Sequence, residues 1–330
     1  MTRDNIVSRR QSPARQALDF GLRAWGSMVA RRYDITRTIV IACAGRSGAT
    51  WLAEILGTLP GYPVIWEPLH LGTNPTSRRY GFDWNTYIPI GASVPGKREY
   101  LEDVLTGRAL CLELLTRRQF ALSQFLWFRG FVVKLTLGNL LLPWMVREFP
   151  VRAVLMIRHP CAVVASQMKH QGWDVVGPDN LTVPDGVLRD FPRLQGCLAM
   201  VSSREEALAF DWAMQTLIPL SAPQPHAWHF LTYEGLIANG AGEVERLFAS
   251  LQEEAPAAAF ARLKTPSATA SRNRDPLNDW RSALRPNQVQ AILRVTREAG
   301  LDFYGESALI DQRKLREFRE GCARTVRDGV

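Results

Sequence analysis

The sequence has no long apolar run and few cysteines, and each shortage excludes a class of protein. No stretch reaches the ~20 apolar residues of a membrane span, and residues 131–146, the longest candidate, are interrupted by Lys134. The five cysteines are widely spaced without a CxxC pair, which argues against a disulfide framework or a zinc site. An apolar segment of a secretion signal is also missing. We therefore expect a cytoplasmic protein with reduced thiols and no metal.

The composition is that of an ordinary globular protein with an excess of arginine. Of the 330 residues, 46% are hydrophobic and 22% are charged, and the formal net charge is +8. Only five of the 40 basic residues are lysines. Such a charge favours an anionic partner. No nucleic-acid motif is present, so we expect a phosphate-bearing small molecule or a membrane surface, and no nucleic acid.

Residues 1–36 are predicted to be an N-terminal extension of a single domain that spans residues 37–330. The extension carries seven arginines against three aspartates. Its apolar residues recur at helical spacing, at Leu18, Leu22, Trp25 and Val29. This pattern predicts a basic amphipathic helix. Such a helix either docks on the domain with its arginines in solvent or contacts a membrane peripherally through residues 14–32.

Short apolar segments alternate with helical patterns along the rest of the chain, which predicts an α/β fold with a central parallel sheet. Strands are expected at 38–43, 62–66, 131–135, 153–157 and 228–231. Helices are expected at 50–59, 110–128, 139–149, 162–169, 204–218 and 242–251. Two segments rich in Gly, Pro, Asn and Asp, 71–100 and 171–203, are predicted to be lids or binding loops, unless each hides a helix.

A glycine-containing turn follows the first predicted strand and reads Gly45-Arg46-Ser47-Gly48-Ala49-Thr50-Trp51. A strand that runs through such a turn into a helix directs unpaired backbone amides at one point, which favours an oxyanion. Arg46 adds a forked positive charge, and Ser47 and Thr50 add hydroxyl groups. The P-loop pattern requires a lysine where Ala49 stands, so nucleoside-triphosphate hydrolysis is disfavoured. A plain turn without a ligand is the alternative.

A second anion-binding pattern follows the strand predicted at 153–157. Arg158 ends this strand, Pro160 begins the next helix, and Ser166 lies eight residues after the arginine. The guanidinium and hydroxyl groups would then share one side of the junction between strand and helix. This arrangement suits a second phosphate, whereas a solvent-facing arginine and a helical serine are the alternative.

Together the two patterns resemble the sulfotransferases that use 3′-phosphoadenosine 5′-phosphosulfate (PAPS), over roughly residues 38–300. Their 5′-phosphosulfate loop is similar to Arg46-Ser47-Gly48-Ala49-Thr50-Trp51, and their 3′-phosphate motif is similar to Arg158 with Ser166. The resemblance implies a nucleotide-kinase-like fold and sulfuryl transfer from PAPS, with adenosine 3′,5′-bisphosphate as product and no metal.

The resemblance extends to two further segments that would contact the nucleotide. Tyr233, in Thr232-Tyr233-Glu234-Gly235-Leu236, matches a family position that lies against adenine in some members; otherwise it is a core aromatic residue. Gly235 replaces the family's usual aspartate. Arg272 and Arg274 stand where the family often has a basic segment that closes over the 3′-phosphate, although a solvated charge cluster fits them equally.

Three residues are candidates for the chemistry. Among carbohydrate-type members the base is commonly a glutamate in a Glu-Pro sequence after the second strand, and Glu67 precedes Pro68 at that position. Glu67 is the expected base, with His70 second, unless Glu67 caps a turn or pairs with an arginine. Lys134 lies within an apolar strand, so it must snorkel, pair with a carboxylate or face the bound anion.

The expected reaction is sulfation of a hydroxyl group on a carbohydrate, a glycolipid or a small natural product. Two other functions remain open at this point. One is a P-loop-type phosphoryl-transfer enzyme. The other is a non-catalytic nucleotide-binding or membrane-associated protein.

Overall fold

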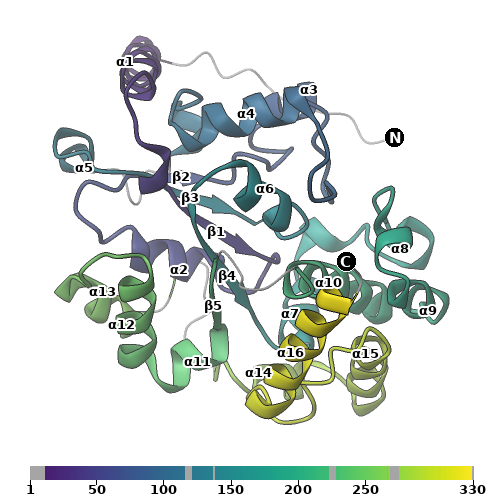
Figure 1. The fold of residues 1–330 in the computed structure, drawn as a ribbon. Coiled ribbons are helices and arrows are strands. Elements are labelled where there is room, and N and C mark those ends of the chain that lie inside the picture. The colour runs from purple at the N-terminus through teal and green to yellow at the C-terminus, as the bar shows by residue number, and fades with distance from the viewer. Residues whose placement is uncertain are drawn as a thin grey trace.

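The computed structural model describes residues 12–115, 121–136, 138–222, 228–265, 267 and 275–328. Its centre is a parallel sheet of five strands in the order β2-β3-β1-β4-β5 (Figure 1). The strands are β1 Ile39–Cys43, β2 Val64–Trp66, β3 Val132–Leu135, β4 Arg152–Ile157 and β5 Trp228–Thr232. The predicted α/β fold with a central parallel sheet is confirmed.

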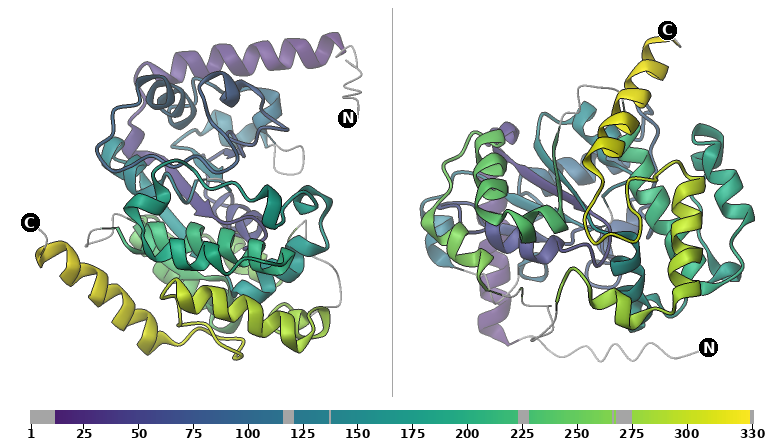
Figure 2. Two further views of the ribbon diagram at one scale, coloured as in Figure 1. Left: turned by 90° about the vertical axis from the view of Figure 1, so that its right-hand side faces the viewer. Right: turned by 90° about the horizontal axis from the view of Figure 1, so that it is seen from below.

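Helices cover both faces of the sheet, which explains why the strands are apolar throughout. Ile39, Ile41 and Cys43 of β1 point to one face, and Val40 and Ala42 point to the other. The first face packs against α2 Ala49–Leu56, α12 Gly240–Ser250 and α13 Ala257–Leu263. The second packs against α4 Pro95–Leu105, α6 Leu142–Glu148, α7 Pro160–Met168 and α10 Arg204–Leu220 (Figures 1 and 2).

The helix predicted over residues 110–128 is wrong. The described residues of this range contain a single 3₁₀ turn, Leu112–Leu114, and the short helix α5, Leu122–Leu126. The amide of Leu112 donates to the carboxylate of Asp19 at 2.7 Å instead of to a preceding carbonyl group. Leu115, after the 3₁₀ turn, and Ala121, before α5, have extended backbone, and the predicted helix is interrupted there.

Both segments predicted as possible loops contain helices. Residues 71–100 contain α3 Thr76–Arg79 and the start of α4, while residues 171–203 contain α8 Val187–Asp190 and α9 Arg193–Ala199. Pro95 lies in the first turn of α4, a position that needs no backbone donor. In these segments a proline or a glycine can stand at the start of a helix, as Pro95 does in α4 and Gly186 does before α8, and not only in a loop.

The N-terminal helix α1, Pro13–Ala30, packs on the domain through part of the predicted apolar stripe. Leu22 and Gly26 are buried, and the Trp25 ring lies 5.1 Å from Phe125 and 5.0 Å from Phe128, between centroids. The remaining helices are α11 Tyr233–Ala238, α14 Asp279–Ala283, α15 Pro286–Glu298 and α16 Gln312–Asp328. In the described part of the chain, every helix is too short or too polar to cross a membrane.

Asp211 of α10 joins two of the irregular segments to the core. Its carboxylate accepts hydrogen bonds from Asn85 Nδ2 at 3.0 Å and from Gln215 Nε2 at 2.6 Å. Asn85 Nδ2 also donates to the Thr182 carbonyl oxygen at 3.4 Å. Burial raises the pKa of Asp211 from its ordinary 3.8 to about 6, although the two hydrogen bonds oppose this shift.

The Asp211→Asn variant should lack the loss of stability that Asp211 causes in wild type as the pH rises. Because the folded-state pKa of Asp211 is raised, the folded protein binds more protons than the unfolded chain between about pH 4 and 6. The contribution of Asp211 to stability is therefore present at low pH and lost as the pH rises through this window. The free energy of unfolding of Asp211→Asn, minus that of wild type, should therefore increase by about 1–3 kcal/mol from about pH 4 to about pH 7.

Urea unfolding across this pH range measures the effect. Asp185→Asn, at an exposed position, is the matched control and should follow the wild-type profile. A constant difference between Asp211→Asn and wild type at every pH would contradict the raised pKa.

Candidate functional site

The carboxyl ends of all five strands bring the candidate residues to one edge of the sheet. Parallel strands end at the same edge, where ligands of such folds bind. The residues at or after these ends are Gly45 to Gly48 after β1, Glu67 after β2, Lys134 and Thr136 at the end of β3, Arg158 after β4 and Tyr233 after β5. Residues up to 188 positions apart thus share one site.

The loop after β1 has the backbone form of an anion-binding turn. Arg46 has φ 73° and Gly48 has φ 100°, both in the left-handed region. Gly48 is the N-cap of α2, so the amides of the first helical turn face the loop. The Ser47 hydroxyl is fully buried and has no nitrogen or oxygen partner among the described residues. The Cys43 thiol is its hydrogen-bond neighbour, and because sulfur is a weak partner, a bound oxyanion would offer this hydroxyl a stronger acceptor.

Aromatic rings pack directly on the two glycines of this loop. A Cβ atom on Gly48 would lie 2.6 Å from the Tyr233 ring, and one on Gly45 would lie 2.5 Å from the Trp173 ring. The Trp51 and Tyr233 rings are in edge contact, with 5.7 Å between centroids. Trp173 was missed by the sequence analysis, and its only signal was an aromatic residue in the irregular segment 171–203.

Arg46 and Arg158 connect the two anion-binding patterns. Arg46 Nε donates to Ser166 Oγ at 3.0 Å, and Arg158 Nη1 donates to the Arg46 carbonyl oxygen at 3.2 Å. Burial and then the nearby Arg158 lower the pKa of Arg46. Neither guanidinium forms an ion pair with a carboxylate within the described residues. Two neighbouring positive charges without a counter-ion favour an anionic ligand.

Tyr233 and Glu234 are the first two residues of α11, directly after β5, and their side chains have different partners. The Arg158 guanidinium stacks over the Tyr233 ring at 4.3 Å, and burial raises the pKa of Tyr233. The Glu234 carboxylate accepts hydrogen bonds from the His159 amide and the Tyr304 hydroxyl, each at 2.8 Å. Glu234 therefore fixes the position of the segment that carries Arg158. Arg272 and Arg274 lie outside the described residues.

Glu67 is held by the end of the neighbouring strand β3. Lys134 Nζ and the Thr136 hydroxyl both donate to Glu67 Oε1, the lysine at 2.5 Å, and the Thr136 amide donates to Oε2 at 3.1 Å. Lys134 also lies over the Trp66 ring at 4.8 Å. Of the arrangements open to Lys134, the structure shows pairing with a carboxylate. Glu67 itself has φ 46°, a backbone strain typical of functional positions.

His70 has a different arrangement from Glu67. Its Nδ1 accepts hydrogen bonds from the amides of Gly72 and Thr73, each at 3.2 Å. A neutral imidazole that accepts at Nδ1 carries its proton at Nε2. With Nδ1 accepting in this way, Nε2 of a neutral His70 is a donor and not an acceptor.

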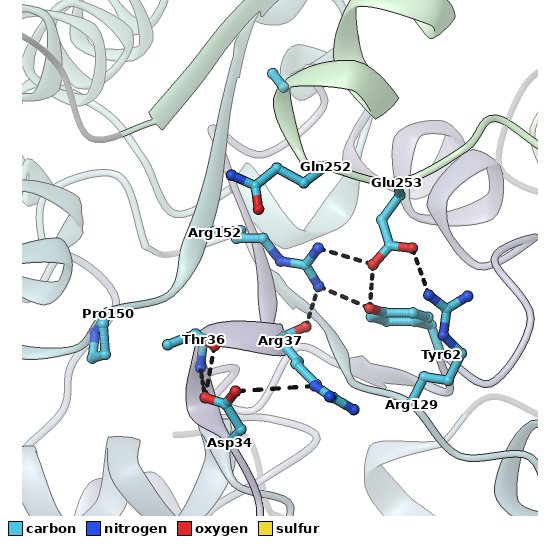
Figure 3. A pocket seen from close by; sticks show the side chains of 10 residues that line it. Asp34, Thr36, Arg37, Tyr62, Arg129, Pro150, Arg152, Gln252 and Glu253 are labelled. Carbon is cyan, nitrogen blue, oxygen red and sulfur yellow. Dashed lines mark hydrogen bonds and ion pairs between the residues drawn. The ribbon is translucent and has the colours of Figure 1, made fainter.

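A separate cavity of about 480 Å³ lies near the amino ends of the strands. Figure 3 shows that its charged groups face one another: the Glu253 carboxylate pairs with Arg152 at 2.9 Å and with Arg129 at 3.2 Å. Arg152 also donates to the Tyr62 hydroxyl at 2.9 Å. These mutual pairs stabilise the start of β4, and the cavity lies at the sheet edge opposite to the candidate residues.

Comparisons with known proteins give no match to a family model and none to a curated protein. Solved structures with a similar fold include the sulfotransferase domain from the curacin biosynthetic pathway, with 15% identity, TM-score 0.42, and coverage of 78% of this chain and 95% of that one. Mouse sulfotransferase SULT7A1 complexed with PAP has 12% identity, TM-score 0.42, and coverage of 91% and 93%. Sulfotransferase STF1 from Mycobacterium tuberculosis H37Rv has 16% identity, TM-score 0.37, and coverage of 84% of both chains.

Proposed function

We propose that this protein transfers a sulfuryl group from PAPS to a hydroxyl group of an acceptor. The supporting observation is the convergence of Arg46 and Arg158, neither paired with a carboxylate within the described residues, on a loop whose buried Ser47 hydroxyl lacks a nitrogen or oxygen partner there. A ligand with two separate anionic groups would compensate both arginines.

Each of the two anion-binding patterns contacts a different part of the nucleotide. The loop from Arg46 to Trp51 binds the 5′-phosphosulfate through its amides, and Arg158 with Ser166 binds the 3′-phosphate. Tyr233, which already contacts both Arg158 and the loop, borders the adenine site. Arg272 and Arg274 would close over the 3′-phosphate. PAPS supplies the activated sulfuryl group, and adenosine 3′,5′-bisphosphate is the product.

Glu67 is the proposed general base. It accepts the proton of the acceptor hydroxyl while the acceptor oxygen bonds to sulfur and the bond from sulfur to the phosphate oxygen breaks. Among the described residues, Glu67 Oε2 accepts one hydrogen bond, from the Thr136 amide, and a carboxylate oxygen has room for a second. Lys134 stabilises the negative charge that the departing oxygen gains.

A saccharide or lipid-linked saccharide is the proposed acceptor class. The assignment follows from Glu67 as base, which is similar to the carbohydrate-type pattern. It is supported by Trp84, an exposed residue whose ring is edge-on to His70 at 5.0 Å between centroids. An exposed aromatic ring beside His70, three residues along the chain from Glu67, can stack on an apolar sugar face.

The first test of this function concerns the 3′-phosphate. Arg158→Ala should weaken binding of adenosine 3′,5′-bisphosphate by about ten- to a hundred-fold, because a charge-assisted contact is lost. Binding of adenosine 5′-phosphate should change little. Isothermal titration calorimetry measures both affinities.

Arg297→Ala, at an exposed position of α15, is the matched control and should bind both nucleotides as wild type does. If the unaltered protein bound the two nucleotides equally, the 3′-phosphate assignment would be wrong.

A second test concerns the base. Glu67→Gln keeps the side-chain shape and removes the proton acceptor, so kcat for sulfation of a saccharide acceptor by radiolabelled PAPS should fall by ~10²–10⁴-fold. The affinity for adenosine 3′,5′-bisphosphate should stay within a few-fold of wild type. His70→Ala should affect kcat much less.

The pattern of losses distinguishes the roles. A larger loss in His70→Ala than in Glu67→Gln would make His70 the base. Equal losses of nucleotide binding and turnover in Glu67→Gln would mean that Glu67 only holds the site together. Nucleotide binding without turnover on any acceptor would favour the non-catalytic alternative.

A further inference from the structure

The helix α1 has a second apolar face, opposite to the one that packs on the domain. Ala17, Phe20, Gly21, Ala24 and Met28 follow one another at helical spacing, and we call them the outer face of α1. All five are exposed; the exposed fraction is 75% for Phe20 and 63% for Met28. Large apolar side chains on a face turned away from the domain are unusual in a soluble protein.

Arginines border the outer face of α1. Arg23, Arg31 and Arg32 are exposed beside this face, Arg15 is exposed on the side of Leu22, and Asp19 is the one acidic residue between positions 13 and 32. Asp19 pairs with Arg23 at 2.7 Å and also accepts the Leu112 amide. This segment therefore keeps a net positive charge around its apolar stripe, a combination typical of helices that lie at an anionic lipid interface.

The short helix α5, next to α1, carries further exposed apolar side chains. It contacts α1 through Phe125, which packs against Trp25, while its neighbours Leu126 and Trp127 are 70% and 76% exposed. Tryptophan is enriched at membrane interfaces, where its ring meets apolar and polar surroundings together. Figures 1 and 2 show α1 along one outer side of the molecule, far from α15 and α16.

We propose that the outer face of α1, together with Leu126 and Trp127, binds the surface of an anionic lipid bilayer. Phe20, Met28 and Trp127 insert at the level of the headgroups, and Arg31 and Arg32 contact the acidic lipids. The helix lies in the plane of the interface without crossing the membrane. This inference is independent of sulfuryl transfer, although it would bring the protein to lipid-linked acceptors.

Charge decides between a bilayer and a second copy of this chain as the occupant. A symmetric pair of α1 helices would bring two arginine-rich segments together, each with Asp19 as its sole acidic residue from position 13 to 32. Like charges at such a contact repel one another, whereas acidic headgroups attract both. The arginines therefore favour the bilayer.

Co-sedimentation with vesicles tests the proposal. Wild type should sediment with vesicles of phosphatidylcholine and phosphatidylglycerol in equal parts and not with phosphatidylcholine alone. The Phe20→Glu/Met28→Glu variant should lose this binding by about ten-fold or more, because two inserting side chains become charged. Arg31→Gln/Arg32→Gln should weaken binding to the anionic vesicles, and added salt should weaken it in wild type.

Matched controls lie at the other end of the molecule. Leu309→Glu replaces an apolar side chain that is 47% exposed, and Arg297→Gln/Arg313→Gln removes two exposed arginines; both should bind as wild type does. Circular dichroism should show unchanged melting of every variant. The proposal is overturned if wild type does not sediment with anionic vesicles, or if Phe20→Glu/Met28→Glu binds them as wild type does. It is also overturned if wild type is a dimer by sedimentation velocity that this variant dissociates.

Discussion

Burial of both faces of the sheet is the constraint on which the arrangement of the site depends. The interior strands β1 and β4 can carry few polar side chains between their ends, because helices cover them on each side. Polar groups are therefore concentrated where the strands end, and parallel pairing places those ends together. Lys134 is an exception within the interior strand β3, and it lies at the register position of Trp66, next to Glu67.

Within the part of the chain that the structure describes, uncharged contacts rather than paired carboxylates stabilise the positive charge of Arg158. Arg158 donates to the carbonyl oxygens of Arg46 and Pro276 and stacks on Tyr233. Carbonyl oxygens and a ring stabilise a guanidinium without cancelling its charge. Glu234 could have paired with Arg158 but is occupied by the His159 amide and Tyr304. The positive charge of Arg158 thus remains available for an anion.

The strands and the glycine turn could be predicted because local sequence determines them. Five short apolar segments form the strands, and Gly48 stands where the turn needs positive φ. Features set by distant contacts could not. The bond from Leu112 to Asp19 joins residues 93 positions apart and holds the start of a segment whose backbone becomes extended at Leu115, where the pattern of 110–128 indicates a helix. The pairing of Lys134 with Glu67 and the packing of Trp173 on Gly45 likewise join segments whose proximity follows only from the strand order.

The environment of Glu67 bears on its role as a base. Both Lys134 and the Thr136 hydroxyl donate to Oε1, whereas Oε2 accepts only the Thr136 amide among the described residues. These three bonds fix the Glu67 carboxylate against the end of β3. The arrangement nevertheless leaves one oxygen with room for an acceptor hydroxyl, while Lys134 lies close enough to respond when Glu67 becomes neutral. If Glu67 took the proton in the proposed reaction, the ammonium of Lys134 would lose its counter-ion, and its charge would then stabilise an oxygen that is becoming negative.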